Sequence, residues 1–262
     1  ETMELRAMIS LLLLLLLGLS MAHPGLVRDN ISCFGLTLSW YLFSFIPLGS
    51  TDFLIEGDVL IPRTRSAMRC FSKTFSCLWS KSANGKYVFC MVADTHEKNE
   101  ILNAMKDFHS KTCIRFVPRV KQRMYISFDR SGMCFSSLGR LGDKQVVSLQ
   151  RFGCVRHGII QHELLHALGF YHEHTRSDRD QYVRINWEYV KQCKNLMPSD
   201  SNNLNTPYDY SSVMHYGRTA FASQFGKETI TPIPDPSVPI GQRQGMSDID
   251  IRRINTLYKC CK

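Results

Sequence analysis

The sequence predicts an α+β fold, in which a mixed sheet with helices precedes a mostly irregular half that ends in a helix. Residues 87–92 are rich in β-forming side chains, and residues 113–117, 124–128 and 145–149 alternate like strands. Other segments carry apolar residues at helical spacing. We expect two halves around a cleft, with the sheet and two of the helices in the N-terminal half.

Three helices are predicted from periodicity and from their end residues. The first spans residues 97–109, where the spacing predicts a buried face of Ile101, Leu102, Met105 and Phe108. The second spans residues 158–168 and ends before Gly169, because glycine readily adopts the left-handed cap conformation. The third spans residues 247–258, and its first residues, Ser247 and Asp250, resemble a capping box.

The chain begins with a targeting segment. Arg6 precedes an unbroken leucine run over residues 11–17, and small residues follow near position 20. This pattern predicts a secretory signal peptide over residues 1–22, with initiation at Met3 or Met8 left open. The alternative is a signal anchor, but the run is shorter than the roughly 20 residues that a membrane span needs.

A second boundary is predicted near residue 65. Arg63 and Arg65 beside Pro62 form a site that trypsin-like proteases cut, although an ordinary surface loop would have the same composition. We therefore expect a prosegment over residues 23–65 and one main domain over residues 66–262, in keeping with a chain of 262 residues that is 44% hydrophobic. The apolar stretch 34–48 has no physical account in this scheme.

Charge and cysteine content also bear on function. Residues 1–65 carry four arginines and six acidic residues, so the net charge of +9 becomes +11 for the rest of the chain. That charge favours acidic or sulfated partners, or serves only solubility. Ten cysteines in a secreted chain predict disulfides.

The densest motif lies in residues 162–172, where histidines have metal-site spacing. His162 and His166 are four residues apart, so a helix presents both imidazoles on one face. Gly169 breaks that helix, and we expect the chain to turn back so that His172 reaches the same metal. Three neutral imidazoles at about 2.0–2.1 Å with an open position for water are typical of catalytic zinc. The sequence therefore predicts one Zn²⁺ per chain.

Glu163 follows the first predicted ligand, which places its carboxylate beside the metal without binding it. Zinc lowers the pKa of a bound water from about 15.7 to roughly 7. Glu163 can accept the proton of that water and pass it to a leaving amine, as a general base and acid. The predicted reaction is peptide-bond hydrolysis. The alternative is a group of histidines with only a structural role. It would require the five fixed positions to match by chance, with a probability on the order of one in 100,000 for this chain.

Residues 162–172, the following Glu173 and the later segment Ser212-Val213-Met214-His215-Tyr216 resemble the astacin family of metzincin proteases. The likeness extends from about residue 68 to residue 260, and residues 203–210, 231–234 and 239–242 look closest to the fish hatching enzymes. The resemblance implies a zincin-like, two-subdomain protease. A twisted mixed sheet and an active-site helix would lie above a largely irregular C-terminal half.

The resemblance also implies roles for single residues. His162, His166 and His172 match the zinc ligands, and Glu163 matches the catalytic base. Met214 matches the turn methionine that packs beneath the metal.

Tyr216 matches the family tyrosine that binds zinc in the resting enzyme and swings to stabilise the oxyanion. On sequence alone it would be an ordinary tyrosine. His174 and His215 are not ligands in the family pattern.

The acidic turn Glu56-Gly57-Asp58 matches the family's inhibitory prosegment motif. Asp58 is the expected latch, which occupies the open zinc position and keeps the zymogen inactive. Cleavage after Arg65 would give a mature chain that begins at Ser66, and the resemblance implies that this new amino terminus lies near Glu173.

The resemblance assigns residues 145–149 to an edge strand, where an extended substrate adds by backbone pairing. It implies the disulfides Cys113–Cys260, Cys134–Cys154 and Cys70–Cys77, with Cys261 as an alternative to Cys260. Cys33 would leave with the prosegment, and the nine cysteines that remain predict a free or intermolecular thiol, since Cys90 and Cys193 have no partner.

The functional prediction is a secreted, zinc-dependent endopeptidase that digests egg-envelope glycoprotein at hatching. We expect activation by a trypsin-like protease, possible storage in secretory granules, and a monomer that binds neither nucleic acid nor, after signal removal, a membrane. The alternatives are a digestive or matrix-processing astacin and a catalytically silent secreted binding module. Loss of Glu163 or of a ligand would mark the silent module, and all four residues are present.

Overall fold

The computed structural model describes residues 52–55, 57–62, 78–81, 87–92, 98–130, 132–191, 196, 198 and 201–260. The chain divides into the compact units Glu1–Phe45 and Ile46–Lys262, and the described residues all belong to the second. The signal peptide, the apolar stretch 34–48, the cleavage site at Arg63 and Arg65, and Ser66 lie outside the described residues. Within the described part, no helix has the length and apolar character needed to cross a membrane.

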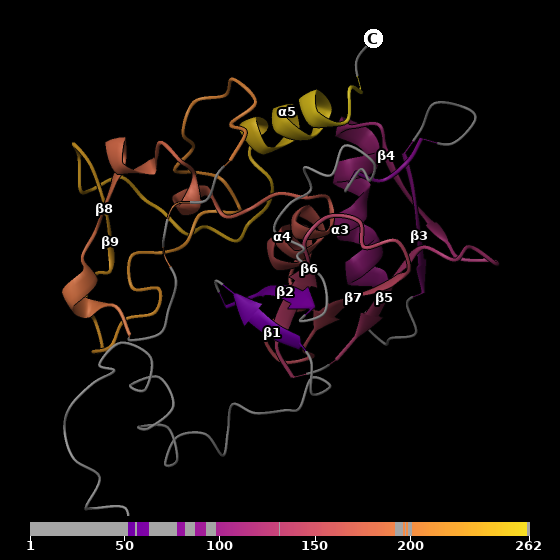
Figure 1. Cartoon of the computed structure of the whole chain (residues 1–262), viewed down its shortest axis with the longest axis horizontal. Helices are drawn as coiled ribbons and strands as arrows, with labels where there is room; N and C mark the ends of the chain where they lie inside the picture. Colours follow the sequence, from indigo (N-terminus) through magenta and orange to yellow (C-terminus); the bar gives the residue numbers. More distant parts are fainter. Residues whose placement is uncertain are drawn as a thin grey trace, which may run out of the picture. The chain divides into compact units, whose positions relative to one another are not determined.

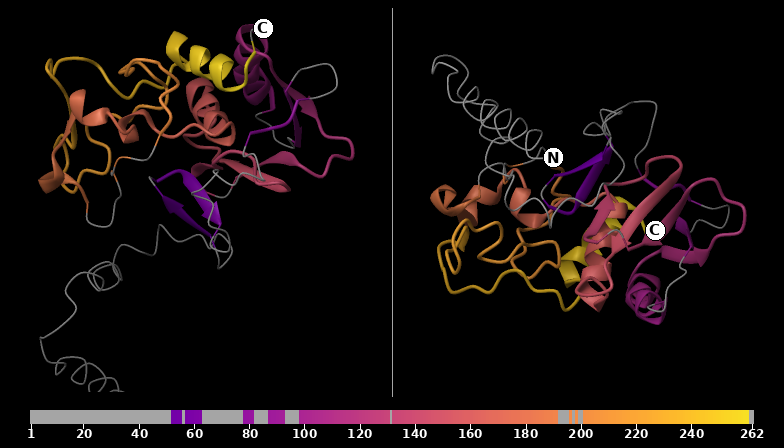
Figure 2. Two further views of the ribbon diagram at one scale, coloured as in Figure 1. Left: turned by 45° about the horizontal axis from the view of Figure 1, so that its top comes forward. Right: turned by 90° about the horizontal axis from the view of Figure 1, so that it is seen from below.

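Within the described residues, seven strands form one mixed sheet in the order β1-β2-β6-β7-β5-β3-β4 (Figures 1 and 2). The pairs β4–β3, β3–β5, β5–β7 and β2–β6 are parallel, whereas β6–β7 and β1–β2 are antiparallel. The bounds are β1 Asp52–Ile55, β2 Val59–Pro62, β3 Tyr87–Val92, β4 Ile114–Pro118, β5 Tyr125–Asp129, β6 Cys134–Ser137 and β7 Lys144–Leu149. All four strands predicted from the sequence are present, within one residue at each end.

One predicted strand position is wrong. Strand β7 pairs with β5 on one side and with β6 on the other, so residues 145–149 are not an edge strand. The strand next to it, β6, has only four residues, two of which are serines, and such a short segment gives no alternating signal. The outer side of β6 pairs with β2, so the segment before residue 63 supplies the last two strands of this side of the sheet.

Two helices of the N-terminal half pack on each other and on the sheet. Helix α3 (Lys98–Lys111) buries Ile101, Ala104, Met105 and Phe108 against α4 and β4. Leu102, predicted to be on this face, is 36% exposed, because it lies about 100° around the helix from Ile101 and Ala104 takes its place on the buried side. The α3 prediction is otherwise confirmed.

Helix α4 (His157–Ala167) is buried along nearly its whole length and packs on α3, β6 and β7. Its first turn lies close to Arg243 of the C-terminal half. A Cβ added at Gly158 would lie only 2.2 Å from the Arg243 carbonyl oxygen, so this approach requires glycine. The helix ends where the sequence predicts, and Gly169 has a φ of +100°. Beyond it the chain reverses direction.

The C-terminal half is mostly irregular, as predicted. It contains the short helices η2 (Glu173–Thr175), η3 (Arg179–Gln181) and η4 (Trp187–Tyr189), and a two-stranded sheet of β8 (Val183–Ile185) and β9 (Ile230–Pro232) that the sequence pattern did not indicate. The final helix, α5 (Asp248–Leu257), begins with the predicted capping box of Ser247 and Asp250.

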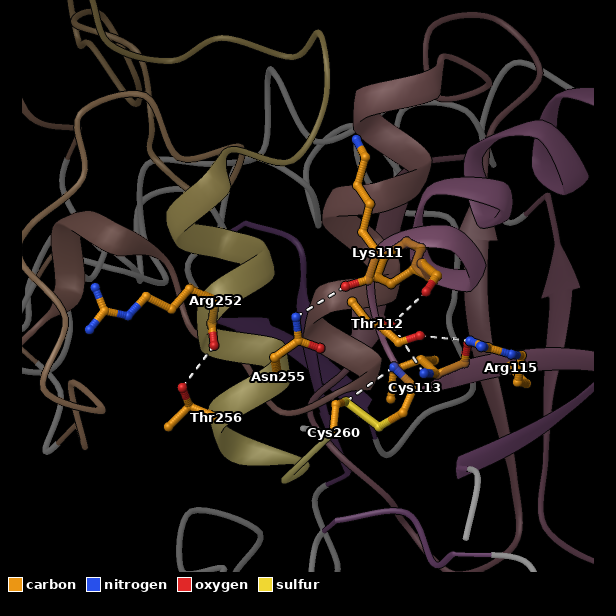
Figure 3. Close-up of a disulfide and its surroundings, with 10 residues drawn as sticks. Lys111, Thr112, Cys113, Arg115, Arg252, Asn255, Thr256 and Cys260 are labelled. Carbon is orange, nitrogen blue, oxygen red and sulfur yellow. Dashed lines mark hydrogen bonds between the residues drawn. A yellow bond between two sulfur atoms is a disulfide. The ribbon is translucent and has the colours of Figure 1, made fainter. Parts of the chain in front are cut away.

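Two predicted disulfides are present, Cys113–Cys260 and Cys134–Cys154. Figure 3 shows the first, which fastens the chain after α5 to the start of β4, while the Asn255 side chain donates to the Lys111 carbonyl at 3.0 Å. Of the two candidates for Cys113, the partner is therefore Cys260. The predicted pair Cys70–Cys77 and residues Cys33, Cys193 and Cys261 lie outside the described residues.

Candidate active site

Helix α4 and the chain that follows it bring three buried histidines together. His162 and His166 lie one turn apart on α4, and their ring centroids are 4.8 Å apart. His172 lies beyond the Gly169 turn, with its ring centroid 5.2 Å from that of His162 and 4.7 Å from that of His166. The helix can supply only two of the rings, so the turn at Gly169 is what completes the group.

Asp58 adds a carboxylate to this group. Its Oδ2 lies 3.1 Å from Nε2 of His162, and its Oδ1 lies 3.1 Å from Nε2 of His172 and 3.7 Å from Nε2 of His166. One ligand atom from each of the four residues lies within 4.8 Å of all the others. The structure therefore joins the three histidines to Asp58, the acidic residue that the family resemblance singled out.

The hydrogen bonds of the imidazoles suit a metal ion at the centre. Nδ1 of His162 lies 2.8 Å from the Val213 carbonyl oxygen, and Nδ1 of His166 lies 2.8 Å from the Phe170 carbonyl oxygen. A carbonyl can only accept, so each Nδ1 carries the proton and each Nε2 keeps its lone pair. The Nε2 atom of His166 is buried and has no hydrogen-bond partner in the described part of the chain. Nitrogen and oxygen donors of this kind fit zinc.

Burial sets the charge of these groups. It lowers the pKa of His162, and it lowers the pKa of His166 to well below the usual range with help from His172. Burial acts to raise the pKa of Asp58, but the attraction of His172 and the close approach of the His162 and His172 rings hold it well below the usual range. Asp58 is therefore ionised, and burial favours the neutral form of His162 and His166.

Glu163 lies next to His162 on α4 and is 1% exposed. Its Oε2 atom is buried and has no hydrogen-bond partner within the described residues. Burial raises the pKa of Glu163 to well above its usual value, and the nearby charge of Asp58 adds to the effect. A carboxyl group held this way is suited to taking up a proton.

Tyr216 lies against the histidine group. Its ring centroid is 4.2 Å from that of His172 and 4.4 Å from that of His174, and its hydroxyl donates to Asp58 Oδ1 at 3.1 Å. Two residues earlier, Met214 is 3% exposed, and its carbonyl accepts a hydrogen bond from the Glu173 amide at 3.1 Å. Tyr216 therefore borders the group, whereas Met214 is linked through its carbonyl to the residue that follows His172.

His174 and His215 are not part of the group that could hold a metal. His215 is committed to other bonds, with its Nδ1 at 2.7 Å from the Tyr216 carbonyl oxygen and its Nε2 at 2.7 Å from the Tyr208 hydroxyl. Burial lowers its pKa to about 4, so it is neutral. His174 is buried between its neighbours, and neither of its ring nitrogens has a hydrogen-bond partner in the described part of the chain.

Comparison with known proteins agrees with this geometry. The family model described as "Astacin", which represents a family of peptidases, matches residues 72–259. The chain belongs to the astacin family. It is 52% identical to the low choriolytic enzyme of Oryzias latipes, over 98% of this chain and 100% of that enzyme. It is 54% identical to high choriolytic enzyme 1 of the same fish, over 79% of this chain and 78% of that enzyme.

A solved structure of high choriolytic enzyme 1, a hatching enzyme zinc-protease from Oryzias latipes, superposes with a TM-score of 0.70 at 53% identity. The match covers 74% of this chain and 98% of the other. The predicted fold class is therefore confirmed. This astacin is a zinc metalloendopeptidase that acts on protein substrates, and among its relatives it is close to the hatching enzymes.

The first turn of α5 in this astacin contributes Asp250, which holds the backbone segment that contacts His162. Asp250 accepts hydrogen bonds from the Ser212 hydroxyl at 2.7 Å, from the Val213 amide at 3.0 Å and from the Ser247 amide at 3.0 Å. The Val213 carbonyl in turn orients His162. Sequence reasoning assigned Asp250 only to a helix cap, because its partners at Ser212 and Val213 lie far away in the chain.

Asp250→Asn should lower the free energy of unfolding of the full chain by on the order of 2–3 kcal/mol, because hydrogen bonds to a buried carboxylate are lost. The exposed Asp248, in the same first turn, provides the matched control Asp248→Asn, with an expected loss below about 1 kcal/mol. Urea unfolding of both variants measures the difference. Equal losses for the two variants would contradict the role given to Asp250.

Proposed function

We propose that the chain is the secreted precursor of a metalloendopeptidase that digests the egg envelope at hatching. The observation that carries the proposal is the convergence of His162, His166 and His172 on one point beside Glu163. In this proposal residues 1–22 are the signal peptide, residues 23–65 the prosegment and residues 66–262 the catalytic domain. The family match over residues 72–259 supports that division.

His162, His166 and His172 are the proposed zinc ligands, each through Nε2. The support is the pair of Nδ1 contacts to backbone carbonyls, which leave Nε2 free to bind in two of the three rings. When bound, zinc supplies a Lewis acid that activates a water molecule for attack on a peptide carbonyl.

Glu163 is the proposed general base. Its buried carboxylate takes the proton of the attacking water and later delivers it to the leaving amine. Tyr216 is the proposed stabiliser of the oxyanion, because its hydroxyl already donates to an anionic oxygen, Asp58 Oδ1. In the resting mature enzyme the same hydroxyl is the proposed additional zinc ligand.

Asp58 is the proposed latch of the zymogen. Its carboxylate lies among the three Nε2 atoms, where it excludes water from the position that catalysis needs. Gly57 makes the approach possible, since its φ is +92° and an added Cβ would lie 3.0 Å from the ring of Phe221. The next strand, β2, then pairs with β6 at Val59 and Leu60. The prosegment thus blocks both the metal position and the sheet edge.

The outer edge of β6 is the proposed binding site for the substrate backbone once β2 has left. An extended peptide that adds to a sheet edge is held mainly by main-chain hydrogen bonds, which suits an endopeptidase with limited side-chain selectivity. The egg envelope is the proposed substrate because the relatives that match most of this chain are named choriolytic enzymes and a hatching enzyme.

Glu163→Gln should lower kcat of the activated enzyme on a peptide substrate at least about 100-fold, since a general base contributes that much or more. The zinc content should stay at one ion per chain, because the proposed ligands are untouched. Glu188→Gln, at an exposed position of η4, is the matched control and should keep full activity. Metal analysis and peptide turnover on the same samples check both parts. Full turnover by Glu163→Gln would contradict the proposed mechanism.

Asp58→Ala should make the uncut precursor active. The test uses a chain in which Arg63→Gln and Arg65→Gln prevent activation, so that turnover requires loss of the latch and displacement of β2, which Asp58 no longer helps to hold against β6. We expect peptide turnover on the order of 10-fold or more above the same chain with Asp58, because an intramolecular ligand acts at a high effective concentration. Turnover that does not differ between the two uncut chains would refute the latch.

The activated enzyme should solubilise isolated fish egg envelope faster than it digests casein, at equal enzyme concentration. Soluble peptide released per unit time measures both reactions, and a general digestive astacin should prefer casein. Equal rates would reject the hatching assignment and leave the endopeptidase class unchanged.

A further inference from the structure

Arg253 of α5 meets a buried carboxylate directly beside one of the proposed zinc ligands. Glu173 is 3% exposed and immediately follows His172 in the chain. Nη2 of Arg253 donates to Oε1 of Glu173 at 2.8 Å, and Nη1 donates to Oε2. The two side chains therefore form a bidentate, buried ion pair across 80 residues of sequence.

Few other groups compensate the charge of Glu173. The Asp209 amide donates to Oε1 at 2.8 Å, and Arg176 approaches Oε1 only to 3.5 Å. Arg176 makes its own bidentate pair with Asp178, with both contacts at 2.8 Å. Arg253 is thus the principal cation for Glu173, and a buried carboxylate without such a partner is costly.

Arg253 is itself held firmly. Its Nε donates to the Thr206 hydroxyl at 2.8 Å, and its Nη2 also donates to the Pro207 carbonyl at 2.9 Å. The helix that carries it is fastened beyond its C-terminal end by the Cys113–Cys260 disulfide (Figure 3). A rigid cation at this point can fix the position of the carboxylate that it binds.

The position of Glu173 bears on His172 because His172 is the one histidine of the group that is not on α4. Its place depends on local bonds of an irregular segment. The Glu173 amide donates to the Met214 carbonyl at 3.1 Å, and the Thr175 hydroxyl donates to the His172 carbonyl at 2.9 Å. If the buried carboxylate lost its partner, Glu173 would have to move, and the adjoining His172 would move with it.

We propose that Arg253 is a positioning residue for zinc binding, which holds His172 in place by compensating the buried charge of Glu173. The proposal rests on His172 as a zinc ligand, as given under Proposed function. Both oxygens of Glu173 accept hydrogen bonds from Arg253 in the uncut chain, so this pair forms before any new amino terminus exists.

The test measures zinc affinity by competition with a chelator, in folded protein, for the precursor and for the activated enzyme. Arg253→Gln removes the charge, and Arg253→Lys keeps the charge but not the bidentate geometry. Arg252→Gln is the matched control, because Arg252 is exposed and Figure 3 shows it directed away from the disulfide side of α5. The double variant Glu173→Gln/Arg253→Gln removes the buried charge together with its partner.

We expect Arg253→Gln to weaken zinc binding about 10- to 100-fold in both forms of the protein, as is common when a group that orients a ligand is lost. Arg253→Lys should fall between this variant and the wild type, and Arg252→Gln should match the wild type. The double variant should recover much of the loss. If Arg253→Gln does not fold, Arg253→Lys and the double variant give the same comparison.

Wild-type zinc affinity in Arg253→Gln would overturn the inference. A double variant that binds zinc no better than Arg253→Gln would also overturn it, because the effect would not pass through Glu173. A loss confined to the precursor would identify the new amino terminus as the cation of the mature enzyme and would overturn it as well. A wild-type chain that binds no zinc would instead refute the site proposed above.

Discussion

An α-helix can present two imidazoles to one point, but not a third, and the whole site depends on how the chain meets that limit. His162 and His166 are fixed relative to each other by a single turn of α4. The third ring must come from outside the helix, and the reversal at Gly169, with its φ of +100°, brings it back. Two rings are therefore fixed by the helix, and the third lies on an irregular segment. Hydrogen bonds from the C-terminal half, such as that between the Glu173 amide and the Met214 carbonyl, hold the segment around His172 in place.

In the proposed zymogen, the segment around Asp58 would occupy the same two features of the domain that a substrate would use. One is the central point of the histidine group, where Asp58 places its carboxylate, and the other is the edge of β6, where Val59 and Leu60 pair with Ser136 and Ser137. Each contact alone contributes little binding free energy, because Asp58 is a single side chain and the β2–β6 pairing consists of a few backbone hydrogen bonds. Because the hairpin turn at Gly57 joins them, each contact raises the effective concentration of the other. In the proposed activation, cleavage after Arg65 would remove that advantage.

The sequence predicts the parts of this site that arise from local rules. Helical periodicity, a glycine cap and a capping box locate α3, α4 and α5, and histidine spacing locates the metal group. It does not predict β6, which is too short to alternate, or the hairpin of β1 and β2, which was interpreted only as an acidic turn. A glycine-containing turn between two apolar runs was a usable hairpin signal there. The pair of Arg253 and Glu173 could not be found this way, because nothing local to either residue identifies a partner 80 positions away.

The distribution of charge explains why such distant partners are needed. Burial favours the neutral form of His162 and His166, and both rings donate to backbone carbonyls, in hydrogen bonds that are weaker than those of charged groups. The charged hydrogen bonds lie at residues next to this group. Arg253 donates to Glu173, which follows His172, and Asp250 accepts from the amide of Val213, whose carbonyl orients His162. A buried ion pair contributes little net stability compared with apolar packing, so its value here is geometric. It fixes the segment that carries His172 without adding a charged partner to the rings of His162 and His166.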